Sequence, residues 1–201
     1  MLNLALSQLL GSRVLDASGA VAGRVREVAI NPQEDSTRIS ALIVRTKAGD
    51  RLVPAHLVSI RENHLFYCNG DPGSWPKVEK PDDLFLLERD LLDQQIIDVH
   101  GRKVVRVNDV DLHNGNGDGG LNLKVAEVDV GTRGAVRRLL KGMVPQNAVE
   151  KLVGKLPTRV IPWEFVDLIE TDPARRVKLK IEHERLSRLH PADIADILEE
   201  L

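Results

Sequence analysis

The sequence predicts a mainly β protein made of two related halves, with a helical hairpin inserted in the second half and helices at the C-terminal end. Three observations support this fold class. A stretch near the N-terminus recurs 82 positions later, apolar residues in both copies alternate with the period of a strand, and residues 134–155 have helical spacing instead. The 201 residues, 42% of them hydrophobic, suffice to bury one large core or two small ones.

The internal repeat is visible without gaps. The stretch LLGSRVLDASGAVAGRVREVAI (9–30) aligns with LLDQQIIDVHGRKVVRVNDVDL (91–112). The same offset continues downstream, where ISALIVRTKAG (39–49) falls on LNLKVAEVDVG (121–131). Because chance rarely keeps one register over such a distance, we interpret the two stretches as a duplication. The identical positions in the first pair are Leu9, Leu10, Asp16, Gly19, Arg24, Val25 and Val28, which match Leu91, Leu92, Asp98, Gly101, Arg106, Val107 and Val110.

Both copies share a slip in the apolar alternation. The phase changes by one residue after Val25 and again after Val107, at equivalent places. A β-bulge at Arg26–Glu27 and at Asn108–Asp109 would absorb the extra residue and keep charged side chains out of the interior. The sequences DASG and DVHG, which are typical of tight turns, precede these strands. Each copy is therefore expected to be a strongly bent, all-β unit.

The copies also share an ending. RLVPAHLVSI (51–60) matches RVIPWEFVDLI (159–169), with Pro54 on Pro162. This offset is 108 residues, so the second copy has 26 more residues than an offset of 82 allows. The extra stretch predicts two helices, with Gly142 and Gly154 at their ends, whose apolar stripe covers one open end of the second barrel. The stripe comprises Val136, Leu139, Leu140, Met143, Val149, Leu152 and Val153.

Residues 71–87 are expected to form a linker between the copies. The stretch CNGDPGSWPKVEKPDD is rich in glycine, proline and charge. Trp75 either anchors this linker on a barrel or is exposed, and the sequence leaves both alternatives open.

The repeated stretches, each followed by a proline-containing strand (VPAHLV, IPWEFVDLI), resemble the PRC-barrel family. This small β-barrel is found in the photosynthetic reaction-centre H subunit and in the C-terminal domain of the ribosome-maturation factor RimM. The resemblance implies two PRC-type barrels in tandem. It places the first barrel at residues 1–70 and the second at residues 88–181, with the helical insertion at about 134–155.

The C-terminal stretch ERLSRLHPADIADILEEL (184–201) resembles the beginning of the cytosolic N-domain of MgtE-type magnesium transporters. Pro191 suits the first turn of a helix, and Asp193 is favourable near its N-terminus. Ile194, Ile197, Leu198 and Leu201 would then form an apolar stripe. The resemblance implies that residues 182–201 begin a truncated N-domain, and that CBS domains follow in the parent protein.

Composition excludes several classes of site. The net charge of -2 gives no overall attraction to nucleic acid or anionic lipid, and 3% aromatic residues offer few stacking platforms. The single cysteine, Cys68, excludes an internal disulfide and a cysteine-based zinc cluster, and it indicates a reducing compartment. No apolar run approaches the ~20 residues of a membrane-spanning helix. We therefore expect a cytoplasmic location, either of a free protein or of the cytosolic portion of a membrane protein.

Metal sites and catalysis are not expected. Asn114, Asn116, Asp118 and Gly119 match the first half of a calcium loop, but Val125 stands where the twelfth-position carboxylate belongs. A hairpin tip, equal in length to residues 31–38 of the first copy, explains the stretch without metal. The acidic C-terminal residues fit a solvated helix face better than a magnesium-sensing surface, and the histidines lack metal-ligand spacing. No nucleophile motif or phosphate-binding loop occurs, so no catalytic, cofactor or metal residue is assigned. The acidic residues are Asp193, Asp196, Glu199 and Glu200, and the histidines are His56, His64, His100, His113, His183 and His190.

The inserted hairpin is the best candidate contact surface. Its basic residues could meet an acidic protein domain, RNA or lipid head groups, although a solvated face is the commoner meaning of such charge. They are Arg133, Arg137, Arg138, Lys141, Lys151, Lys155 and Arg159.

These observations favour a non-enzymatic binding and regulatory module. The partner would be another protein, or downstream CBS or transporter domains of a magnesium-transporter-type parent, and exposed strand edges would permit a weak homodimer. Two alternatives stay open: an RNA- or ribosome-associated assembly factor of the RimM kind, and a divalent-cation sensor.

Overall fold

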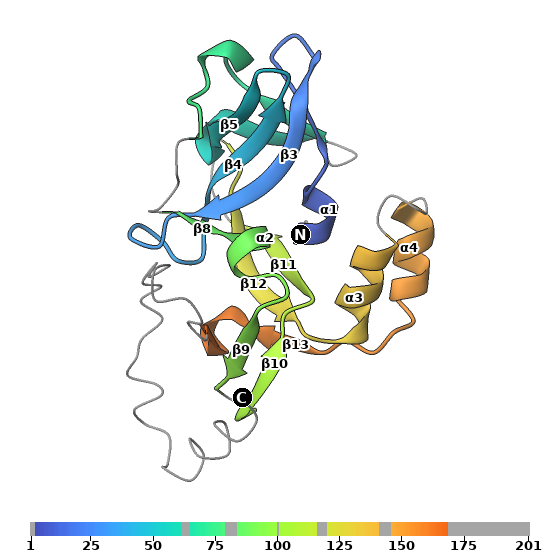
Figure 1. Ribbon diagram of the computed structural model, residues 1–201. Coiled ribbons are helices and arrows are strands. Elements are labelled where there is room, and N and C mark those ends of the chain that lie inside the picture. Colours follow the sequence, from blue (N-terminus) through green and yellow to red (C-terminus); the bar gives the residue numbers. More distant parts are fainter. Residues whose placement is uncertain are drawn as a thin grey trace.

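The computed structural model describes residues 3–61, 65–78, 84–99, 101–115, 120–140 and 146–168. The fold is mainly β (Figure 1). The first half contains β1 (Asn3–Ala5), α1 (Leu6–Leu9), β2 (Arg13–Leu15), β3 (Val21–Ile30), β4 (Ile39–Thr46), β5 (Gly49–Pro54), η1 (Ala55–Leu57), β6 (Val58–Arg61) and β7 (Leu65–Cys68), and a short helix η3 (Pro72–Ser74) follows.

The second half repeats this order of elements. It contains β8 (Phe85–Leu86), α2 (Leu87–Asp90), β9 (Gln95–Asp98), β10 (Lys103–Arg106), β11 (Asp109–Asn114), β12 (Leu123–Asp129), α3 (Thr132–Leu139), α4 (Gln146–Val153), β13 (Val160–Pro162), η4 (Trp163–Phe165) and β14 (Val166–Leu168). The long strand β3 thus corresponds to β10 and β11 together.

The first half forms a sheet that curls through about half a barrel, in the order β5-β4-β3-β2-β7-β6. The predicted bulge in β3 is confirmed, because Arg26 is skipped between the pairs Val25↔Val44 and Glu27↔Ile43. Gly23 lies where β3 crosses close to β4, and a side chain there would collide with the carbonyl oxygen of Arg45. The bulge predicted at Asn108–Asp109 is not found. The strand is interrupted there instead, because β10 ends at Arg106 and β11 begins at Asp109.

The two halves exchange their first strands. Strand β8 of the second half pairs antiparallel with the end of β3, where Phe85 lies opposite Ile30. In return, β1 pairs with β11, where Leu4 lies opposite Leu112. Figure 1 shows β8 and α2 next to β3, and the N-terminal segment next to β11. Phe85 and Leu86, which lie at the end of the expected linker 71–87, therefore form part of the sheet, and Leu87 begins α2.

A single large apolar core contains side chains from both halves. It includes Leu4 and Phe66 from the first half and Leu91 and Leu112 from the second, all fully buried. Trp75 is only 4% exposed and belongs to the same core, so of the two alternatives for this residue the anchoring one is confirmed. Burial of this much apolar surface across the junction is the main force that holds the halves together.

The strand registers revise the alignment of the two copies. Leu42 lies opposite Val28, and Val128 lies opposite Val110, so the offset on β4 and β12 is 86 residues instead of 82. The ladder of β11 and β12 therefore extends two pairs further, to Asn114↔Leu123, than the ladder of β3 and β4, which ends at Ile30↔Ile39. The connection that remains, residues 115–122, has the same length as residues 31–38, as expected. Alternating strands tolerate this shift because an even displacement keeps each apolar side chain on the same face.

The same comparison locates the helices. Val53 pairs with Leu42, and Ile161 pairs with Val128, which confirms an offset of 108 residues on β5 and β13. With offsets of 86 and 108, the connection from β12 to β13 is 22 residues longer than that from β4 to β5. Helices α3 and α4 lie in this connection, where the sequence predicts helices, and they stand to one side of the strands (Figure 1).

The predicted apolar stripe of these helices is buried only in part, since Val149 and Val153 are buried but two leucines are not. Leu139 is 73% exposed and Leu152 is 50% exposed. The buried positions of α3 are Gly134 and Arg137, so this helix turns a polar face inward. The reason is that the adjacent strand β11 begins with a buried carboxylate, Asp109, which requires a charged or hydrogen-bonding partner.

Candidate interaction surface

The basic residues of the helical hairpin divide into an inner and an outer group. Arg137 is only 8% exposed and is paired with Asp109 and Asp111. Arg138 forms a two-pronged ion pair with Asp93 at 2.7 and 3.0 Å. These two side chains contribute to the fold, so the sequence-based surface of seven basic residues was too large.

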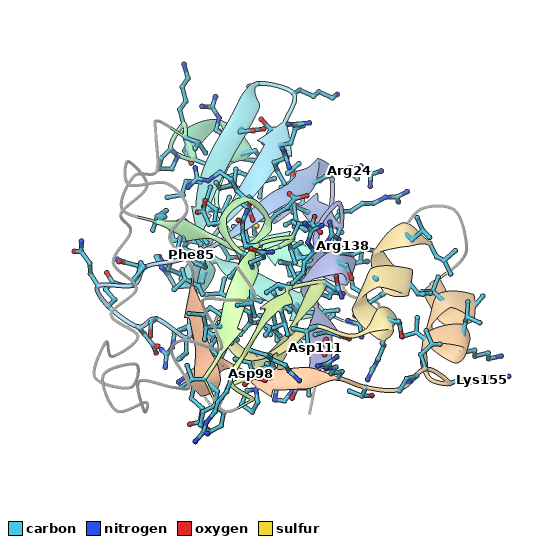
Figure 2. All side chains as sticks on the ribbon, turned by 60° about the horizontal axis from the view of Figure 1, so that its bottom comes forward. Arg24, Phe85, Asp98, Asp111, Arg138 and Lys155 are labelled. Carbon is cyan, nitrogen blue, oxygen red and sulfur yellow. The ribbon has the colours of Figure 1, made fainter. Side chains whose placement is uncertain are left out.

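The remaining basic residues differ in their surroundings. Arg133 donates a hydrogen bond from Nη1 to Oγ1 of Thr158 at 3.2 Å. Lys151, Lys155 and Arg159 are exposed, and Figure 2 shows Lys155 at the outer end of the hairpin. Lys141 lies outside the described residues. The hairpin and the residues that follow it therefore expose three cations and two leucines, Leu139 and Leu152, and exposed apolar side chains are a common feature of binding surfaces. We refer to these exposed side chains together as the outer face of the hairpin.

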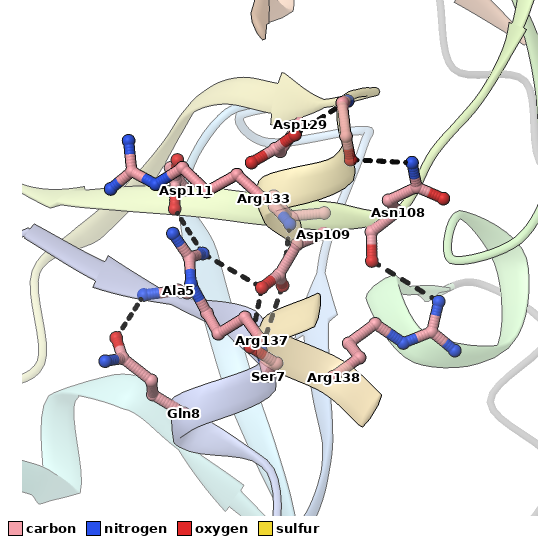
Figure 3. Close-up of polar contacts among 12 residues, drawn as sticks. Ala5, Ser7, Gln8, Asn108, Asp109, Asp111, Asp129, Arg133, Arg137 and Arg138 are labelled. Atoms are coloured by element: carbon pink, nitrogen blue, oxygen red, sulfur yellow. Dashed lines mark hydrogen bonds and ion pairs between the residues drawn. The ribbon is translucent and has the colours of Figure 1, made fainter. Parts of the chain in front are cut away.

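Beneath α3 lies a carboxylate that connects three segments (Figure 3). Asp109 Oδ1 accepts hydrogen bonds from the backbone N–H groups of Ser7 at 3.0 Å and Val110 at 2.9 Å. Its Oδ2 accepts from the Ser7 hydroxyl and from Arg137 Nη1 at 2.9 Å. Arg137 Nη1 also donates to Asp111 Oδ1 at 3.0 Å. One buried carboxylate thus holds α1 of the first half and α3 of the second against β11.

The first half contains the counterpart of Asp109. Glu27 lies 82 positions earlier and is also buried. Its Oε1 accepts from the backbone N–H groups of Val28 and Glu88, both at 2.8 Å, and its Oε2 accepts from that of Arg89 at 3.0 Å. Burial raises the pKa of Glu27, although the backbone hydrogen bonds oppose this. Each half therefore offers a carboxylate to the first helix of the other half.

The burial of these two carboxylates differs from the prediction made from the apolar pattern. The phase slip in each copy predicts a bulge that keeps the charged residues Glu27 and Asp109 out of the interior. In fact Glu27 is 5% exposed and Asp109 is fully buried. The missed signal is that both copies have a carboxylate at the slip, followed by valine, and two such groups can accept backbone N–H groups that water would otherwise satisfy.

A further carboxylate is less well satisfied. Asp129, at the end of β12, is fully buried, and its Oδ1 accepts from the backbone N–H of Gly131 at 2.8 Å. Its Oδ2 accepts no hydrogen bond from the described residues. Burial is the main cause that raises the pKa of Asp129, and repulsion from Asp111 and Asp109 adds to it, while Arg137 opposes it.

The other sequence-predicted candidates remain apart. Asn114 is exposed and pairs with Leu123 at the end of the β11–β12 ladder, while residues 116–119 lie outside the described residues. His56 and His113 lie on η1 and β11, and the other four histidines fall outside the described part of the chain, as do residues 184–201 with their acidic side chains. Within the described ranges, no three histidine, cysteine or carboxylate side chains form a group that could hold a metal ion.

Cys68 is fully buried at the end of β7. Burial raises the pKa of its thiol to about 12. Such a thiol is protonated at neutral pH, which makes it a poor nucleophile.

Comparisons with known proteins give no family for this chain. No protein-family model matches it, and no curated protein matches it significantly. In the part of the chain that the structure describes, no helix is long and apolar enough to cross a membrane.

Proposed function

We propose that the chain is a non-enzymatic binding module that contacts a protein partner through the outer face of the α3–α4 hairpin. The observation that carries the proposal is the exposure of Leu139 and Leu152, together with three exposed cations in the same stretch of chain. Large apolar side chains that are exposed on short helices gain free energy when a partner covers them. The cations Lys151, Lys155 and Arg159 favour a partner with an acidic rim around an apolar centre.

The scaffold supports this role. Strands β12 and β13, which carry the hairpin, pair with each other and continue into the shared core. The hairpin is closed at its base by a hydrogen bond from the N–H of Val130 to the carbonyl of Arg159, and the N–H of Asn108 holds the end of β12 by donating to the carbonyl of Asp129. A contact element mounted on a rigid sheet binds with a smaller entropic cost than a free loop.

The sequence resemblances extend the proposal. The bent strands and the repeated order of elements are compatible with two PRC-type barrels in tandem, the second with the helical insertion. The stretch 184–201 supports a parent protein of the magnesium-transporter type, in which this chain would be a cytosolic regulatory part. On this proposal the hairpin's partner is a neighbouring domain of the parent protein or a separate protein bound to it.

The test compares a double surface variant with a single-substitution control in the tagged full chain, expressed in its own host. Leu139→Asp with Leu152→Asp alters the hairpin, and Val21→Asp is the control, because Val21 is 59% exposed on β3 in the other half. We expect one defined protein to co-purify with the wild type and with the control but not with the double variant. The purified partner should then bind the wild-type chain and the Val21→Asp control directly with similar affinity, and the double variant much more weakly.

Two results would refute the proposal. Equal recovery with the double variant and the control would show that the hairpin is not the contact. Binding of RNA with a steep salt dependence, lost on substitution of Lys151 and Lys155, would favour the assembly-factor alternative.

A further inference from the structure

The helical hairpin is attached to the sheet by charge and not by an apolar core. Among the described residues, neither apolar cluster includes a side chain of α3 or α4. Val149 and Val153 are buried, but they belong to neither cluster. The attachment instead consists of Arg137 on Asp109 and Asp111, and of Arg138 on Asp93, which link α3 to the segments that precede and form β11.

The surface under α3 is shaped for close approach. A Cβ atom at Gly134 would lie 3.0 Å from Cβ of Asp109 and 3.1 Å from Cγ of Asp129. The absence of a side chain at this position lets the helix backbone rest directly on the two carboxylates. The guanidinium of Arg137, one turn further along, then reaches between Asp109 and Asp111 (Figure 3).

The hairpin does not satisfy all the hydrogen-bond acceptors of the surface beneath it. Three carboxylates meet there, Asp109, Asp111 and Asp129, against one buried guanidinium. Asp129 Oδ2 is buried and accepts no hydrogen bond from the described residues, and Nε of Arg133 is a buried donor that has no acceptor among them. An unmet acceptor in a fully buried carboxylate costs free energy, so the hairpin is an incomplete ligand for the surface on which it rests.

From this geometry we propose that the Asp109–Asp111–Asp129 surface is an arginine-recognition site, that Arg137 occupies it within the chain, and that the α3–α4 hairpin is a displaceable cover. The partner that fits is a protein segment presenting an arginine, whose planar guanidinium can bridge two carboxylates. A donor that also reached Asp129 Oδ2 would satisfy the site better than the chain's own hairpin does.

Displacement is physically reasonable because the hairpin and the core are held by different forces. Opening the hairpin exposes polar groups that water can satisfy, whereas opening the core exposes a large apolar surface. Local opening of α3 should therefore cost less than global unfolding. This inference concerns the inner face of the hairpin and does not depend on the outer-face contact proposed above.

The first test is hydrogen exchange on the full chain. Arg137→Met keeps the aliphatic stem and removes the guanidinium, and Lys151→Met is the control on the exposed side of α4. We expect Arg137→Met to speed exchange of the α3 amides by about tenfold or more while the β3 and β4 amides are unchanged, and Lys151→Met to change neither. Equal loosening of α3 and of the β3–β4 amides would show that Arg137 belongs to the global fold, and would overturn the idea of a cover.

The second test asks whether the site recognises a guanidinium as such. The full chain with Arg137→Ala is heated with millimolar ethylguanidinium or, as control, ethylammonium, which has the same charge without the planar fork. We expect ethylguanidinium alone to raise the melting temperature of this variant, and to leave the wild type and an Asp109→Asn, Arg137→Ala double variant unchanged. Equal effects of the two cations on the Arg137→Ala chain, or no effect of either, would refute an arginine-recognition site.

Discussion

The buried glutamate of the first half gives the sharpest prediction about how the halves depend on each other. Glu27 accepts three backbone hydrogen bonds, one from its own strand and two from the N–H groups of Glu88 and Arg89 in the other half. Glu27→Ala removes both acceptor oxygens and thus all three hydrogen bonds at once. It should therefore weaken α2 at a distance of about sixty residues along the chain.

The magnitude follows from the number and burial of these contacts. Each lost hydrogen bond from a part-buried amide costs about 1 kcal/mol, because water reaches such a group only partly. Removal of a buried carboxylate, whose pKa is raised by burial, returns some of this loss. We expect the free energy of unfolding to fall by about 2 kcal/mol, and Glu27→Gln, which keeps one acceptor oxygen, to cost about half as much.

The assay combines denaturant unfolding with hydrogen exchange. The amides of Glu88 and Arg89 should exchange faster in Glu27→Ala, and the whole chain should still unfold in one transition. Glu34→Ala, a change at an exposed position in the β3–β4 turn, is the control and should have no measurable effect. An unchanged free energy of unfolding in Glu27→Ala, together with unchanged exchange of those two amides, would refute the reasoning.

Three further predictions concern single side chains. Asp129→Asn should raise the free energy of unfolding at pH 7 by about 1 kcal/mol, because the pKa of Asp129 is raised in the folded state. The stability that the protonated carboxyl retains below pH 3.8 is lost as the pH rises through the raised folded-state pKa, and the amide avoids this loss, so a gain that shrinks between pH 4 and pH 8 would contradict the prediction. Gly134→Ala should lower the free energy of unfolding by about 1 kcal/mol despite the better helix propensity of alanine, because its Cβ would crowd Asp109, and a more stable variant would show that α3 is not tightly docked. Cys68 should resist an aromatic disulfide reagent at pH 8 in the native state and react on unfolding, as measured by thiolate release; fast native reaction would contradict its burial and its pKa of about 12.

The fold class and the repeat could be predicted because they depend on local alternation. The period-two pattern and the bulge after Val25 are properties of single strands, and the sequence displays them directly. The helices at 132–139 and 146–153 could be predicted because the helical spacing of apolar residues is also a local property of the sequence. The four-residue shift on β12 was not visible, because an even displacement leaves the alternating pattern unchanged.

The exchange of first strands could not be predicted, because it depends on which copy each strand meets. Strands β1 and β8 are too short to specify a partner by pattern, since Leu4 and Leu86 are equivalent apolar residues in both copies. The inward turn of Arg137 was hidden in a similar way. On a short basic helix, only the position of the facing carboxylate Asp109 decides which cation is buried.

The most direct test of the account is whether the two halves hold together without a covalent link. A protease site inserted between Asn69 and Gly70, both exposed, allows the folded chain to be cut between β7 and β8. Because β8 lies on β3, β1 lies on β11 and the core is shared, the cut protein should elute in size-exclusion chromatography as one species of the intact size and melt in one transition. Separation of the fragments into two species under native conditions would contradict the reciprocal exchange on which this account depends.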